Sequence, residues 1–345
     1  MLRIALLLGA PLLLLSLIEG VWQLIGDPRI AANRAWLAAQ PPHFRLSDRG
    51  MLRSDPDPEV AFTLRPGFDE VVGGNRYRVN ELGLRGGPVA VPKPAGHKRV
   101  LVLGDSYAFG FGVAEKDTLA AQLQRALAAP HREVEVLNAG VPGYHTGQEL
   151  QVLVRNGSKL APDLVVLVYY ANDNITPTFL YDPRLRIVYV DELPLPDWIK
   201  RVMARSILYS KLTKAYTAWL THRGALDSRG ERHWPTTRAR LQAIAGWCRA
   251  QRIGLVLAAI PALDNSIDFI NKTHVYNRDH DRLLTFAKGA GIAVADLRAV
   301  LLQRAKPIED LFVSRKPPDS HLTGEGYRLL AAAVVEAIRG GGLLR

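Results

Sequence analysis

The residues of this 345-residue chain that could do chemistry are a serine near position 106 and an acid–histidine pair near the C-terminus. Ser106 ends the stretch LVLGDS, and PPDSHLTGEGY at 317–327 contains Asp319 and His321. A serine hydroxyl is a weak nucleophile until a base takes its proton and a third group orients that base. The pattern therefore predicts Ser106 as nucleophile, His321 as the base and later the acid, and Asp319 as the carboxylate that orients the imidazole.

Acyl transfer also needs hydrogen-bond donors for the oxyanion that develops on the attacked carbonyl. Three candidates stand in separate blocks of the sequence: the backbone N–H of Ser106, the backbone N–H of Gly140 in NAGVPG, and the side-chain amide of Asn172 in YYANDN. Glycine suits this task because the backbone of a residue without a side chain can approach a substrate closely.

The elements that must position these residues alternate between strands and helices. Short apolar runs predict buried strands at 99–104, 133–140, 163–170, 253–261 and 292–297. Amphipathic stretches predict helices near 118–127, 147–160, 236–251, 277–289 and 324–339. This alternation predicts an α/β protein with a parallel sheet and helices on both faces.

In such sheets the ligand site lies beyond the carboxyl ends of the strands. Ser106 follows the first of these strands, Gly140 ends the second and Asn172 follows the third. The three residues are therefore expected on one rim of the sheet.

These blocks, in this order, resemble the SGNH (GDSL-type) hydrolase superfamily over about residues 98–340. The resemblance is carried by GDS at 104–106, Gly140, Asn172-Asp173 and Asp319-x-His321. It implies a flavodoxin-like α/β/α sandwich with a central parallel sheet. It also implies that the serine, glycine, asparagine and histidine of the family motif correspond to Ser106, Gly140, Asn172 and His321.

The sequence departs from the family pattern at three places. GDSY replaces the frequent GDSL, and Tyr170-Ala171-Asn172-Asp173 replaces Gly-x-Asn-Asp. The usual Asp-x-x-His is shortened to Asp-x-His, a spacing also found in branches with polysaccharide O-acetyltransfer and deacetylation enzymes. The bulky Tyr107 and Tyr170 are expected to narrow or reshape the acyl pocket.

The N-terminus carries the strongest apolar run, IALLLGAPLLLLSLIEGVWQLI at 4–25. Extended past Glu19 it reaches the roughly 20 residues that cross a bilayer. A cleaved signal peptide is the alternative, but no good small-x-small cleavage site follows the run. We predict a transmembrane signal anchor at 1–26 and an extracytoplasmic (periplasmic) catalytic domain.

The rest of the chain divides by composition. Residues 27–97 are rich in turn signals and predict an irregular, partly β extension, in which NELGLRG (80–86) is expected to form a tight turn with an exposed Arg85. The hydrolase domain is expected at 98–340, with an insertion at about 174–235. Within the insertion, 197–223 is basic with apolar residues at helical spacing. It predicts a surface helix packed on the core, the alternative being a lid or a membrane-surface helix.

The net charge of +11 invites a nucleic-acid interpretation, but the arginines are scattered and no nucleic-acid motif accompanies them. We interpret the positive charge as favouring contact with anionic lipid. No metal-ligand spacing occurs among the histidines, so neither metal nor cofactor is expected.

The favoured function is an ester hydrolase acting on an O-acylated carbohydrate or lipid of the cell envelope through an acyl-Ser106 intermediate. Two alternatives remain open. One is an O-acyltransferase on the same triad, and the other is a non-catalytic envelope protein on the same fold.

Overall fold

The computed structural model describes most of the chain, and the chain divides into two compact units. The first unit comprises Met1–Phe62 with Pro177–Leu226, and the second comprises Thr63–Thr176 with Asp227–Arg345. The described residues are 14–21, 50–57, 59–128, 133–174, 178–182, 187–191, 193–203, 206–222, 229–261, 275–303, 309–311, 313 and 321–344.

The second unit is built on a five-stranded sheet in which every neighbouring pair of strands is parallel. Its strands are β5 (Lys98–Leu103), β6 (Val134–Asn138), β7 (Leu164–Tyr169), β10 (Gly254–Ala259) and β11 (Ala293–Asp296). They lie in the order β11-β10-β7-β5-β6. Read from β6, the chain order is 2-1-3-4-5, which is the flavodoxin-like topology. The predicted parallel sheet is confirmed.

The sheet is buried on both faces, because successive side chains of a strand point to opposite sides. On β5, Val100 and Val102 enter one hydrophobic core, while Leu101 and Leu103 enter the other. Strands buried in this way must be apolar throughout, which explains their continuous apolar runs.

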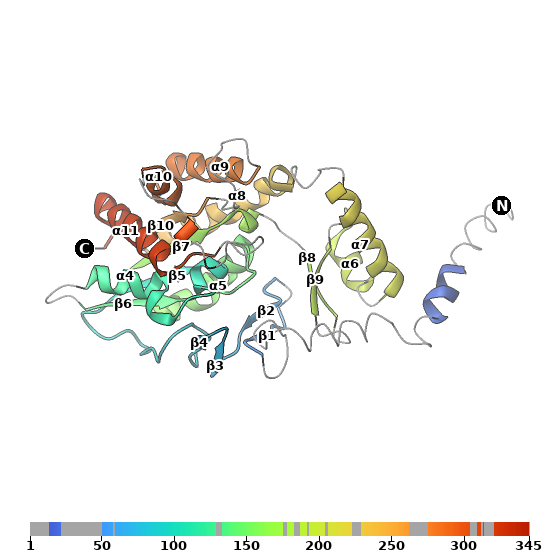
Figure 1. The fold of residues 1–345 in the computed structure, drawn as a ribbon, viewed down its shortest axis with the longest axis horizontal. Helices are drawn as coiled ribbons and strands as arrows, with labels where there is room; N and C mark the ends of the chain where they lie inside the picture. The colour runs from blue at the N-terminus through green and yellow to red at the C-terminus, as the bar shows by residue number, and fades with distance from the viewer. Residues whose placement is uncertain are drawn as a thin grey trace. The chain divides into compact units, whose positions relative to one another are not determined.

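Helices cover both faces of the sheet (Figure 1). One core is closed by α4 (Leu119–Leu127), α10 (Leu297–Leu302) and α11 (Gly324–Gly341). The other is closed by α5 (Thr146–Leu160), α8 (Arg229–Ala250) and α9 (Val275–Ala290). The unit is therefore a three-layer α/β/α sandwich.

The segment that precedes the sandwich contains four short strands, β1 (Leu52–Ser54), β2 (Phe62–Leu64), β3 (Asp69–Val72) and β4 (Asn75–Arg78). β1 pairs with β2, and β3 with β4. Gly73 and Gly74 turn the antiparallel β3–β4 hairpin with φ values of 58° and 82°. Two consecutive positive φ values are what such a two-residue turn requires.

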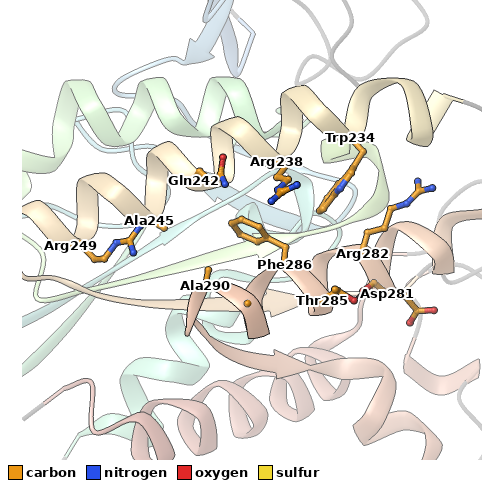
Figure 2. Close-up of a pocket in the computed structure, with 11 residues that line it drawn as sticks. Trp234, Arg238, Gln242, Ala245, Arg249, Asp281, Arg282, Thr285, Phe286 and Ala290 are labelled. Carbon is orange, nitrogen blue, oxygen red and sulfur yellow. Dashed lines mark hydrogen bonds between the residues drawn. The ribbon is translucent and has the colours of Figure 1, made fainter.

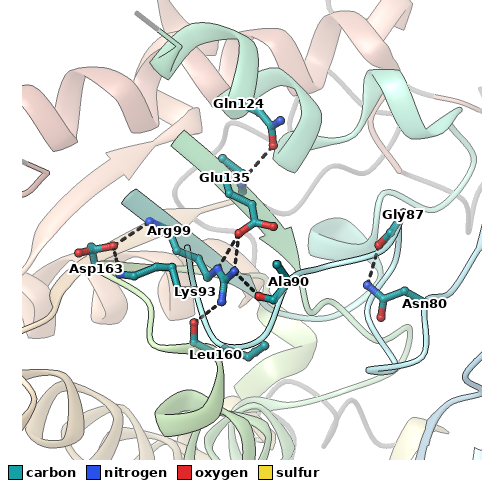
Figure 3. Close-up of polar contacts among 10 residues, drawn as sticks. Asn80, Gly87, Ala90, Lys93, Arg99, Gln124, Glu135, Leu160 and Asp163 are labelled. Carbon is teal, nitrogen blue, oxygen red and sulfur yellow. Dashed lines mark hydrogen bonds and ion pairs between the residues drawn. The ribbon is translucent and has the colours of Figure 1, made fainter. Parts of the chain in front are cut away.

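A buried polar network holds the amino end of β5, the strand that precedes Ser106 (Figure 3). The Arg99 side chain is fully buried and donates to Glu135 Oε2 at 2.7 Å, Leu160 O at 2.7 Å and Ala90 O at 2.8 Å. Beside it, Asp163 Oδ2 accepts from Lys93 Nζ at 2.6 Å and from the Arg99 backbone N–H at 2.7 Å. The network lies at the end of β5 opposite to the predicted site, so it serves stability.

Replacing Asp163 by asparagine is expected to lower the free energy of unfolding by about 1–2 kcal/mol at pH 7, because the ion pair with Lys93 is lost. Burial alone raises the pKa of Asp163, but the hydrogen bonds from Lys93 and from the Arg99 backbone outweigh it and lower that pKa. The stabilisation is therefore complete above the ordinary pKa of 3.8 and is lost as the pH falls through the lowered pKa.

Urea unfolding of both proteins across pH 2.5–7 measures this difference. The control is Glu70→Gln, which alters an exposed carboxylate of β3. A difference between wild type and Asp163→Asn that stayed constant through the acid range would contradict the assignment.

The described part of the first unit contains a helix at 14–21 and most of the insertion. The insertion holds an antiparallel hairpin, β8 (Thr178–Asp182) with β9 (Ile187–Asp191), and two helices, α6 (Asp197–Met203) and α7 (Ile207–His222). The predicted single helix at 197–223 is therefore divided. Four apolar side chains of this stretch, Trp198, Val202, Leu212 and Trp219, are 69%, 71%, 55% and 47% exposed, and the predicted packing of the stretch on the core stays a prediction.

The apolar N-terminal run is described only at 14–21, and the other residues of the predicted anchor lie outside the described part. Among the described residues, none of the helices has the length and apolar character needed to cross a bilayer. Glu19 Oε2 accepts from the Leu208 backbone N–H at 2.9 Å and from Ser206 Oγ at 3.2 Å. A carboxylate at a helix N-terminus is stabilising, so Glu19 caps α7.

Candidate active site

Ser106 is the first residue of a four-residue helix, α3 (Ser106–Phe109), that begins directly after β5. The turn between strand and helix requires Gly104, whose φ is 144° and where a Cβ would lie 2.8 Å from Val168 O. Asp105 caps the helix, its Oδ1 accepting from the Tyr107 N–H at 2.8 Å. The sharp turn places the serine hydroxyl at the carboxyl end of the sheet.

The structure brings Ser106 and His321 together, although 215 positions separate them in the sequence. Ser106 Oγ lies 2.8 Å from His321 Nε2. This distance is within hydrogen-bond reach, so the imidazole can take the hydroxyl proton when the serine attacks. Both side chains are half-buried and remain accessible to a substrate.

His321 is held in place by a backbone hydrogen bond and by two aromatic rings beside its imidazole. Its backbone carbonyl accepts from the Val313 N–H at 2.8 Å, and two residues later Thr323 caps α11. Its ring lies 5.1 Å from the ring of Tyr107 and 5.1 Å from the ring of Phe111. Asp319 lies outside the described residues, so its role as the orienting carboxylate stays a prediction.

Gly140 follows β6 and packs directly against α3. A Cβ at this position would lie 2.2 Å from Phe109 N and 2.6 Å from the carbonyl carbon of Ala108. The Gly140 N–H donates to Asn138 Oδ1 at 3.0 Å. In this state the amide that was expected to face an oxyanion has a protein partner, and what the geometry requires at position 140 is the absence of a side chain.

Asn172 lies in η3 (Ala171–Asn174), which follows β7. Its Nδ2 donates to Asp105 Oδ2 at 2.9 Å. An amide nitrogen carries two hydrogens, so Nδ2 can donate a second hydrogen bond. Ser106 and Asn172 thus lie beyond β5 and β7, on either side of the point where the strand order reverses. That point is where ligands bind in sheets of this type.

Two buried aspartates, one beside Ser106 and one beside Asn172, hold the site through hydrogen bonds. Asp105 joins the Tyr107 N–H and the Asn172 amide. Asp173 Oδ2 accepts from the Tyr170 N–H at 2.7 Å. Burial raises the pKa of both carboxyl groups, and the hydrogen bonds from Tyr107 and Asn172 partly offset this for Asp105. Both aspartates are fully buried and act through hydrogen bonds within the protein.

A groove lies elsewhere, between α8 and α9 (Figure 2). It has a volume of about 630 Å³, and its lining residues include Trp234 and Phe286 together with Arg238, Gln242 and Arg249. None of the predicted catalytic residues lines it. This groove is therefore separate from the surface that carries the Ser106–His321 contact.

One feature of the site was interpreted wrongly from the sequence. Arg85 of the NELGLRG turn was expected to be exposed, but only 4% of its surface is accessible. Its guanidinium donates to the backbone carbonyls of Phe109 and Gly110, at the end of α3. Arg85 was expected to be exposed because it follows a turn built by Asn80 and Gly83. A single sequence does not show whether the side chain after such a turn points to solvent or into the protein.

The fold is a three-layer α/β/α sandwich, and Ser106 and His321 meet at the carboxyl edge of its parallel sheet. The sequence pattern of the GDSL-like Lipase/Acylhydrolase family matches residues 102–329, well over half of the chain. The chain belongs to this family and is an ester-bond hydrolase. No curated protein sequence matches it.

Several solved structures are similar over most of the chain. TesA is 16% identical, with a TM-score of 0.45 and coverage of 71% of this chain and 99% of TesA. A lipase/acylhydrolase from Enterococcus faecalis is 18% identical, with a TM-score of 0.42 and coverage of 72% and 97%. The acetyl xylan esterase AlAXEase is 18% identical, with a TM-score of 0.41 and coverage of 70% and 99%.

Proposed function

We propose that this protein is a serine esterase that removes an acyl group from an O-acylated carbohydrate or lipid of the cell envelope. The observation that carries the proposal is the 2.8 Å contact between Ser106 Oγ and His321 Nε2. A nucleophile within hydrogen-bond reach of its base is the minimum unit for covalent catalysis by serine.

The reaction proceeds in two steps. Ser106 Oγ attacks the ester carbonyl while His321 Nε2 takes its proton, and the same imidazole then protonates the departing alkoxide. The acyl group is left on Ser106 as an ester. Water, deprotonated by His321, attacks that ester and releases the carboxylic acid, and the proton returns to Ser106. The Asn172 amide and the Ser106 N–H stabilise the oxyanion formed in each step.

The surroundings of the dyad support a small acyl group. Aromatic rings lie around the catalytic histidine, with Tyr107 and Phe111 each 5.1 Å from the His321 ring. Tyr170 packs against Tyr107 at 4.7 Å between ring centroids. Bulky side chains this close to His321 leave little room for a long acyl chain, so acetyl is the acyl group proposed.

The proposal places the enzyme at a membrane, with residues 1–26 as the anchor and the catalytic domain outside the cytoplasm. Its support is the apolar run at 4–25 together with the exposed Trp198 and Trp219 on a basic stretch. Amphipathic surfaces of this composition favour anionic lipid surfaces. Alkaline carbonate extraction of membranes from expressing cells tests the anchor, since release of the full-length protein into the soluble fraction would contradict it.

The central experiment uses the full-length protein in detergent with p-nitrophenyl esters of two to twelve carbons. We expect turnover of the acetyl ester, a steep decline with chain length, and covalent labelling of the Ser106 peptide by a serine-reactive phosphonate. The Ser106→Ala variant controls for labelling at other nucleophiles. Labelling at another residue would refute the mechanism. Labelling of Ser106 with no release of acid to water, but with acyl transfer to an added sugar, would refute hydrolysis and favour the acyltransferase.

A further inference from the structure

The turn at NELGLRG directs an arginine into the protein. Asn80 Oδ1 accepts from the backbone N–H groups of Leu82 and Leu84, each at 3.0 Å. Asn80 Nδ2 donates to Gly87 O at 2.9 Å (Figure 3). The side chain that follows this turn, Arg85, is 4% exposed. Burying a guanidinium costs free energy unless its hydrogen bonds are satisfied, so its partners matter.

Those partners are all backbone carbonyls next to the nucleophile helix. Arg85 Nη1 donates to Phe109 O at 2.7 Å and to Gly110 O at 2.6 Å, and Nη2 donates to Val113 O at 2.8 Å. The carbonyls at the C-terminus of a helix lack partners within the helix and carry partial negative charge. Arg85 satisfies them with a positive charge at the end of α3 opposite to Ser106.

Aromatic rings surround the cation. The guanidinium carbon lies 4.8 Å from the centroid of the Tyr77 ring and 4.6 Å from that of Phe109. Burial lowers the pKa of Arg85 to about 10, so the group still carries its charge at neutral pH. A planar cation with several fixed donors suits this position, and lysine offers a point charge without the same geometry.

Arg85 also links α3 to the loop that contains Asn138 and Gly140. The Arg85 N–H donates to Asn138 O at 3.0 Å, and Asn138 Nδ2 donates to Phe109 O at 3.2 Å. Asn138 Oδ1 accepts from the Gly140 N–H. Phe109 O is thus held from both sides, by Arg85 and by Asn138, and these contacts link α3 to the Gly140 loop.

The loop after α3 reaches the catalytic base. Gly112 donates its N–H to Tyr77 Oη at 3.0 Å, and its carbonyl accepts from Asn75 Nδ2 at 3.0 Å. The neighbouring Phe111 ring lies against the His321 ring. Within the 109–113 loop, Phe111 therefore contacts His321, and the next residue, Gly112, contacts β4.

We propose that Arg85 is a positioning residue, which fixes α3 and the 109–113 loop so that Ser106 and His321 stay within hydrogen-bond reach. The proposal rests on the proposed function in taking Ser106 as nucleophile. A misplacement of about 1 Å can cost about 10²-fold in rate, so loss of the guanidinium is expected to lower kcat by about 10- to 100-fold and to leave KM nearly unchanged.

The test compares Arg85→Met and Arg85→Lys with Arg99→Met. Arg99 is the matched control, because it is also a buried arginine that donates to backbone carbonyls, but at the opposite end of β5. We expect kcat per folded molecule and the rate of phosphonate labelling of Ser106 to fall in both Arg85 variants and to stay at the wild-type level in Arg99→Met. Equal losses in the Arg85 and Arg99 variants, in proportion to lowered stability, would overturn the proposal.

A rescue experiment separates positioning from stability. Arg85 lines a pocket of about 430 Å³ together with Gly86 and Asn138, which gives a small molecule a path to the vacated position in Arg85→Gly. Millimolar guanidinium is expected to restore kcat at least 10-fold, and urea at the same concentration is expected to restore nothing. Equal effects of the two compounds would contradict the proposed role.

Phosphonate labelling distinguishes this proposal from the esterase proposal. If the wild type hydrolyses no ester but labels rapidly at Ser106, esterase function fails while slower labelling of the Arg85 variants still supports positioning. If the labelling rate is the same in wild type, Arg85→Met and Arg85→Lys, positioning by Arg85 is overturned even for an active esterase. A wild type that does not label at all overturns both.

Discussion

Replacing Ser106 by alanine, or His321 by alanine, is expected to lower kcat for p-nitrophenyl acetate by about 10⁴- to 10⁶-fold. The reason is the 2.8 Å contact between Ser106 Oγ and His321 Nε2, through which the two residues act as one unit. When one of two residues that act together has been removed, removing the other lowers kcat little further. The double variant is therefore expected to be about as slow as either single variant.

The measurement is steady-state kinetics of the three variants with active-site titration of the wild type. The control is His97→Ala, which removes a histidine that lies before β5 and outside the site. Effects of Ser106→Ala and His321→Ala that multiplied in the double variant would show that the two residues act independently, against the assignment of His321 as the base for Ser106.

Replacing Gly140 by alanine is expected to cost about 1–3 kcal/mol of stability and about 10²-fold in kcat. The new Cβ would lie 2.2 Å from Phe109 N and 2.6 Å from the carbonyl carbon of Ala108, both of which belong to the backbone of α3. Backbone atoms cannot rotate away as a side chain can, so α3 itself must shift. Ser106 belongs to the same short helix and is displaced with it.

The comparison is Gly246→Ala, since a Cβ at this glycine of α8 meets no atom within 4 Å. Alanine is the better helix former, so this control is expected to be neutral or stabilising. Thermal unfolding and kcat of both variants measure the effect. A stable and fully active Gly140→Ala protein would show that the loop relaxes around the methyl group, and it would remove the steric role assigned to Gly140.

The sheet and its helices were predictable because apolar runs and helical spacing alternate repeatedly along the sequence. The strand predicted at 99–104 is β5, and the helix predicted at 147–160 is α5, each within about one residue. Continuous apolar runs and helical spacing follow from burial on both faces of a sheet, which local sequence records directly. The convergence of Ser106 and Asn172 on one rim followed from the parallel topology alone.

The features that were missed depend on contacts that leave no periodic pattern in the sequence. The burial of Arg85 is decided by carbonyls 24 to 28 positions further along the chain. The hydrogen bond of the Gly140 amide to Asn138 joins residues only two positions apart, but it leaves no periodic signal in the sequence, and neither does the division of 197–223 into α6 and α7. A charged residue after a glycine-containing turn is usually solvated, and only the three-dimensional structure shows the partners that make its burial favourable.

The carboxylate of Asp105 has a consequence for how the enzyme meets its substrate. One of its oxygens accepts from the Tyr107 N–H in α3 and the other from the Asn172 amide in η3. Ser106 and Asn172, the proposed nucleophile and oxyanion donor, are thus linked through one carboxylate before any ester arrives. Binding need not order two separate loops, so the conformational entropy that an induced-fit site would lose on each encounter is lost once, when the chain folds.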